Sequence, residues 1–68
     1  MKCTKVLARN LKFLMYARNK ESFDIAQALE VSIPIVISWT TGKAIPEGKY
    51  LDNLAAYFDV TVAALFTE

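Results

Sequence analysis

The middle of the chain limits the fold more than any other part, because it combines two short helical patterns with a tight turn. Ile25, Ala26 and Leu29 recur at i, i+1 and i+4, the spacing of a helix face that turns inward. Residues 30–32 break this spacing, and Ser32 is a good N-cap for a second helix. We therefore expect a helix-turn-helix here.

The second helix of this pair has an inward and an outward side. Val36 and Trp39 lie three residues apart and predict the inward side, which Val31 extends just before the cap. The outward side then holds Ile33, Pro34, Ile37, Ser38 and Thr41. The alternative is a rotated helix with Ile33 and Ile37 in the core.

The sequence leaves two helix starts open. Either Ser22 or Glu21 caps the first helix of the pair. Pro34 fits the first turn of the second helix, where its missing N–H has no intrahelical partner. Proline also disfavours the α conformation at Ile33, so the N-cap is either Ser32 or Ile33.

Three further helices are expected, at about residues 4–18, 48–58 and 62–66. The first has an apolar stripe at i, i+4, i+7 and i+8, formed by Leu7, Leu11, Leu14 and Met15. Its other sides carry Val6, Phe13, Tyr16 and Ala17. Gly42 suits the end of the helix-turn-helix, and Thr61 caps the last helix. The predicted fold class is therefore all-α with five helices.

Length and composition indicate one small domain, residues 1–68. A core of this size is marginal unless it is densely apolar, and 54% of the residues are hydrophobic. We expect a cytoplasmic protein without a membrane span, because no apolar run approaches the roughly 18–20 residues that a bilayer requires. The single cysteine, Cys3, and the absence of histidine argue against a disulfide, a metal site or a cofactor.

Charge is distributed unevenly along the chain although the net charge is only +1. The first twenty residues contain no acid, and their basic residues are Lys2, Lys5, Arg9, Lys12, Arg18 and Lys20. The acids lie further on, at Glu21, Asp24, Glu30, Glu47, Asp52, Asp59 and Glu68. This asymmetry is compatible with one face that attracts phosphate, or with an ordinary solvated helix face.

From about Leu7 to Phe66 the chain resembles the small DNA-binding domains of the lambdoid-phage repressor and Cro type. The matching residues are Ile25, Ala26, Leu29, Val31, Ser32, Val36, Trp39, Gly42, Lys43, Pro46, Leu51, Leu54, Ala55, Val60, Thr61, Leu65 and Phe66. The resemblance implies a compact five-helix repressor-like domain whose second and third helices form the helix-turn-helix. It also implies a phage or prophage transcriptional regulator that places its third helix in the major groove, as a homodimer on double-stranded operator half-sites.

The chain departs from this family at two places. The family favours glycine at the position of Glu30, where the backbone is left-handed. Either the turn opens here, or glutamate accepts strain of about 1 kcal/mol. Members commonly join the first helix to the third by a buried arginine–glutamate pair, and Met15 and Thr40 stand at these positions. Replacing a whole buried pair by apolar packing can be neutral or stabilising.

The resemblance also implies the DNA-binding residues. Positions that meet base edges correspond to Ile33, Pro34 and Ser38, and positions that meet phosphates to Ser22, Thr41 and Lys43. Ser32 and Ile37, at the start and on the outward side of the third helix, complete the expected set. Residues 31–42 contain no Arg, Lys, Asn or Gln, so the bidentate contacts that read guanine or adenine are missing. Apolar contact with thymine methyl groups would remain.

Two other functions stay open. The isoleucines of the third helix could bind a protein partner, such as a repressor, because exposed apolar patches usually mark interaction sites. Unspecific DNA binding or an antitoxin role is a third hypothesis. We do not expect an enzyme, because no histidine or metal-ligand spacing is present. The expected dimer surface comprises Val62, Leu65 and Phe66 with Tyr50 or Tyr57, although Leu65 could instead be core.

Overall fold

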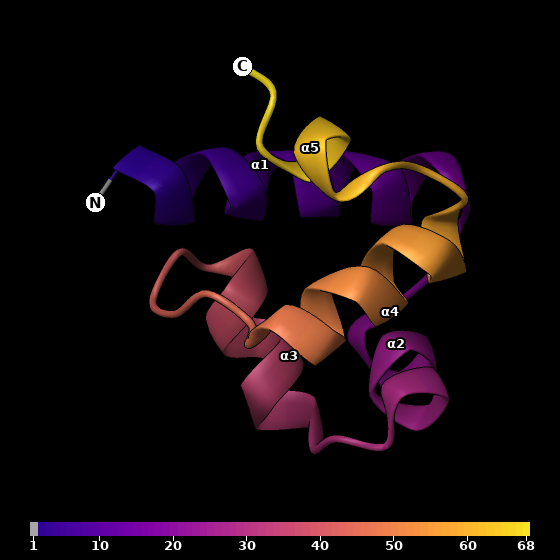
Figure 1. The fold of residues 1–68 in the computed structure, drawn as a ribbon. Coiled ribbons are helices and arrows are strands. Elements are labelled where there is room, and N and C mark those ends of the chain that lie inside the picture. The colour runs from indigo at the N-terminus through magenta and orange to yellow at the C-terminus, as the bar shows by residue number, and fades with distance from the viewer. Residues whose placement is uncertain (1) are drawn as a thin grey trace.

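The structure, a computed structural model, describes residues 2–68. Within this range the chain forms five α-helices and no strand (Figure 1). They are α1 (Lys2–Ala17), α2 (Ser22–Leu29), α3 (Ile33–Thr40), α4 (Gly48–Phe58) and α5 (Val62–Leu65). The all-α, five-helix prediction is therefore confirmed, with helix bounds within about two residues of those expected.

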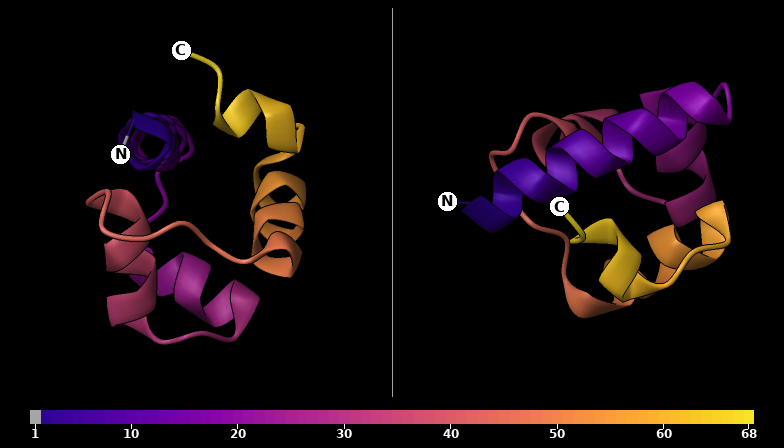
Figure 2. Two further views of the ribbon diagram at one scale, coloured as in Figure 1. Left: turned by 60° about the vertical axis from the view of Figure 1, so that its left-hand side comes forward. Right: turned by 90° about the horizontal axis from the view of Figure 1, so that it is seen from above.

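The helices pack in a closed circuit around one core. α1 contacts α3 and α5, α2 contacts α3 and α4, and α4 contacts α5. The left view of Figure 2 shows α1 end-on, with α3 directly below it and α4 across the molecule from α3. Each helix contributes at least one fully buried side chain, from the set Leu7, Leu11, Ile25, Val36, Leu54, Phe58 and Leu65. Leu65 is therefore core and cannot be part of a dimer surface.

Left-handed residues terminate several of the helices. Asn19 follows α1 with φ of 56°, Glu30 follows α2 with φ of 59°, and Asp59 follows α4 with φ of 57°. At Glu30 the turn does not open, because its N–H and that of Val31 both bond the Ala26 carbonyl. Glu30 therefore adopts the strained left-handed conformation, and the hydrogen bonds of the turn are kept.

The structure decides which residues cap α2 and α3, the two helix starts that the sequence left open. Glu21, not Ser22, is the N-cap of α2, and it forms a capping box in which the Asp24 carboxylate accepts a 2.8 Å hydrogen bond from the Glu21 N–H. Ser32 is the N-cap of α3 and Pro34 lies in the first turn. Thr61 caps α5 as predicted, since its Oγ1 accepts a bond from the Ala64 N–H at 3.1 Å.

Two aromatic residues of α1 lie outside the core. Phe13 is 68% exposed and Tyr16 is 88% exposed, so neither side chain belongs to the core. Leu7 and Leu11 already fill the inward face of α1, which leaves these two rings in water. Thr40 is buried, and its Oγ1 donates to the Ile37 carbonyl at 3.0 Å. The buried hydroxyl of Thr40 is therefore satisfied within α3.

Candidate nucleic-acid interface

The outward face of α3 is exposed as the sequence predicts. Val36 and Trp39 are buried, at 0% and 3% exposure. Ile33 is 40% exposed and Ile37 is 45% exposed, which excludes the rotated helix. Ile35 is also exposed, at 44%. At 3.6 residues per turn it lies on the opposite flank of the exposed face from Ile33 and Ile37. The helix therefore presents three isoleucines to solvent.

The centre of this face is the stripe Pro34, Ser38 and Thr41, which are spaced i, i+4 and i+7. The Ser38 hydroxyl donates to the Ile35 carbonyl at 2.6 Å, and the Thr41 hydroxyl donates to the Ile37 carbonyl at 2.8 Å. Both protons are used within the helix, so each oxygen faces outward as an acceptor. In this arrangement the hydroxyls match the amino groups of cytosine or adenine better than they match phosphate oxygens.

The start of α2 is less suited to phosphate than the sequence suggested. Ser22 is the first residue of α2 and is half-buried between the capping residues Glu21 and Asp24. The Asp24 carboxylate already accepts a backbone N–H at this helix end. A phosphate placed there would meet two negative side chains, which oppose the attraction of the helix dipole.

A basic groove lies between α1 and the end of α3. Its volume is about 400 Å³, and its lining residues are Lys5, Ala8, Arg9, Lys12, Thr40, Thr41 and Gly42. This described lining contains three cations and no carboxylate. The cations recur at i, i+4 and i+7 along α1, a spacing visible in the sequence. Their proximity to Thr41 depends on the tertiary fold, and sequence reasoning missed it.

Gly42 brings the exit loop of α3 against α1. Its φ is +78°, a left-handed conformation that glycine adopts without strain. A Cβ built on Gly42 would lie 3.6 Å from the carbonyl oxygen of Thr4 and 3.9 Å from the Cα of Lys5. This approach closes one end of the basic groove. Lys43, the next residue, is exposed.

At the other edge of the groove, Arg9 reaches the C-terminal residues. Its Nη2 donates to the carbonyl oxygens of Thr67, at 3.4 Å, and Glu68, at 3.2 Å. Asn10 adds two shorter bonds, from Nδ2 to the carbonyls of Leu65 and Thr67, each at 2.8 Å. These bonds hold the guanidinium at the rim, so Lys5 and Lys12 are the more available cations.

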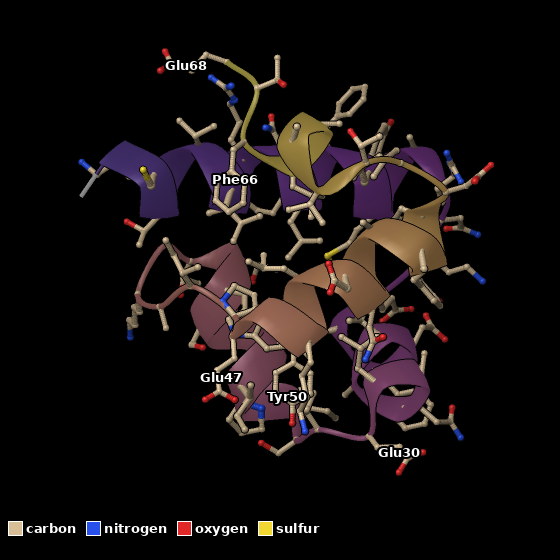
Figure 3. The ribbon with its side chains drawn as sticks, in the orientation of Figure 1. Glu30, Glu47, Tyr50, Phe66 and Glu68 are labelled. Atoms are coloured by element: carbon tan, nitrogen blue, oxygen red, sulfur yellow. The ribbon has the colours of Figure 1, made fainter. Side chains whose placement is uncertain are left out.

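Glu68 lies at the rim of the groove beside Arg9, whereas Glu30 and Glu47 lie far from it. Figure 3 shows Glu30 and Glu47 at the side of the molecule opposite α1, with Tyr50 beside Glu47. Tyr50 packs against Trp39, with ring centroids 5.8 Å apart, and this contact joins α4 to α3. Glu30 at the end of α2 and Glu47 at the start of α4 are therefore remote from the basic row on α1.

Comparisons of the chain with protein-family models, with curated proteins and with solved structures found no match. None of the helices in residues 2–68 is long and apolar enough to cross a membrane. Across the same residues, no group of three or more His, Cys, Asp or Glu side chains is arranged to hold a metal ion.

Proposed function

We propose that this chain is a DNA-binding transcriptional regulator of the phage repressor or Cro class, with α3 in the major groove. One observation carries the proposal: the uncharged, exposed face of α3 ends at Thr41, which also lines the basic groove of α1. A reading surface and a phosphate-attracting surface are thus continuous. B-DNA offers this combination, because its major groove admits an α-helix and phosphates border the groove.

Base reading would rest on apolar contact and on one acceptor. Ile33, Pro34 and Ile37 are exposed and can meet thymine methyl groups. Ser38 Oγ, whose proton is held by Ile35, can accept from the amino group of cytosine or adenine. Ser32 at the start of α3 and Lys43 after it flank this surface. We leave Ser22 out of the proposed phosphate contacts because of the carboxylates beside it.

The test is a fluorescence-anisotropy titration of labelled random-sequence and genomic DNA between 50 and 200 mM salt. The few cations on this surface predict a shallow salt slope, about −2 to −5, at roughly −0.9 per phosphate contact. Lys43→Ala should weaken binding to all sequences alike. Affinity that does not change over this salt range would contradict phosphate contact altogether.

A second function, binding of a protein partner through α3, is favoured by the three exposed isoleucines at 40–45% exposure. Such a patch has the composition of an interaction surface. Under this alternative, Ile33→Ser should abolish capture of the partner and leave weak DNA binding unchanged. Under the DNA proposal, the same variant should lose sequence preference.

A further inference from the structure

We propose that the groove of α1 holds phosphates of the DNA backbone, so that α1, and not the start of α2, is the main phosphate-contacting helix. This inference rests on the proposed function and assigns a phosphate site to Lys5, Arg9 and Lys12, beside the Thr41–Gly42 segment. DNA backbone is the occupant because the groove is continuous with the exposed face of α3 through Thr41.

The three cations form a row that matches an extended polyanion. Lys5, Arg9 and Lys12 span seven residues, or about 10 Å at 1.5 Å per residue. One DNA strand carries a phosphate for about every 3.4 Å of helix axis, so a row of this length can face more than one consecutive phosphate. Lys5 and Lys12 are exposed, and neither ammonium forms an ion pair with a carboxylate in the described part of the chain. Both charges are therefore available to an incoming anion.

The contrast with α2 explains the choice of helix. The start of α2 carries two carboxylates, those of Glu21 and Asp24, on either side of Ser22. In the groove, the described lining residues carry positive charge and hydroxyl groups only, apart from Ala8 and Gly42. The carboxylates at the start of α2 repel a phosphate, whereas the cations of the α1 groove attract it. A DNA strand is therefore drawn toward α1.

The experiment compares two doubly neutralised variants with the same net charge. Lys5→Gln/Lys12→Gln removes the lysines of the groove, and Arg18→Gln/Lys20→Gln removes two exposed cations just beyond the C-terminal end of α1. The groove variant should bind DNA more weakly, with a salt slope shallower by about 2 per bound copy. The control variant should keep the wild-type slope. Equal effects of the two variants on slope and affinity would overturn the proposal.

A second measurement separates this proposal from the DNA-binding proposal. In a heteronuclear NMR titration with pyrophosphate, the amide signals of Thr41 and Gly42 should shift, and the shift should disappear in Lys5→Gln/Lys12→Gln. Shifts at Ser22 and Phe23 instead would assign phosphate to α2 and overturn the groove. If the wild-type protein binds no DNA but still gives the Thr41 and Gly42 shifts, the DNA-binding proposal is contradicted and the anion site in the groove is retained. Thermal unfolding confirms that each variant remains folded.

Discussion

Ile33 and Ile37 are large apolar side chains on an exposed helix face, where they contribute little to folding. Replacing either by serine should change the free energy of unfolding by no more than about 0.5 kcal/mol. In DNA binding, Ile33→Ser should remove a preference at a thymine-bearing position worth about 1–3 kcal/mol. Chemical denaturation and competition binding with single-base operator variants measure the two effects.

Val36 provides the matched control on the same helix, because its side chain is fully buried. Val36→Ser removes core contacts and buries an unmatched hydroxyl, so the loss of stability should be several times larger than that of Ile33→Ser. Comparable losses for the two variants would mean that Ile33 is a packing residue and that the outward face of α3 is misassigned.

The hydroxyls of Ser22 and Ser38 test which residues belong to the proposed interface. Ser22→Ala should leave DNA affinity unchanged, because Ser22 is half-buried and flanked by Glu21 and Asp24. Ser38→Ala should instead weaken discrimination at one base pair by up to about 1–3 kcal/mol, since it removes the outward acceptor. Affinity measurements on a matched series of operator sequences test both. A larger loss for Ser22→Ala would restore the start of α2 as a DNA contact.

Among the helix ends, the turn between α2 and α3 stores conformational strain at Glu30. Glycine adopts φ near 59° without a Cβ clash, so Glu30→Gly should stabilise the fold by about 1 kcal/mol. The gain is measured as a shift in the midpoint of thermal unfolding. Asn19→Gly is the control, because asparagine already tolerates this conformation and should gain less.

Helix positions could be predicted from the sequence because their signals are local. The spacing of Ile25, Leu29, Val36 and Trp39 fixes both helices and their inward faces within a few residues of chain. The cap of α2 was ambiguous because Glu21 and Ser22 are both suitable, and the reciprocal bond to Asp24 decides between them.

Contacts between distant residues could not be predicted in this way. Thr41 meets Lys5 and Lys12 only because α3 packs on α1, and periodicity within one helix carries no information on that pairing. The same reason applies to Leu65, whose apolar side chain suits a dimer surface or a core equally well until α5 is placed on α1. The fold class is thus accessible from sequence, whereas the site depends on how helices meet.

For the whole molecule, the proposal implies assembly on DNA. A single small reading surface without bidentate contacts should bind weakly, so we expect a symmetric dimer on two half-sites about one helical turn apart. With Leu65 in the core, the remaining candidates for the shared surface are the half-buried Val62, Phe66, Tyr50 and Tyr57. The exposed rings of Phe13, Tyr16 and Phe23 are further candidates. Analytical ultracentrifugation should show two copies per operator. A monomer at high micromolar concentration on operator DNA would rule out this assembly.

The three exposed isoleucines of α3 also contribute to the change in heat capacity when a partner binds. Any partner that covers them removes apolar surface from water, and this gives a negative heat-capacity change whatever the chemical nature of the partner. An anion held by the α1 groove alone would change affinity with salt and give little heat-capacity change. Calorimetry over a range of temperatures, repeated at two salt concentrations, therefore reports separately on how much each of the two surfaces takes part in a complex.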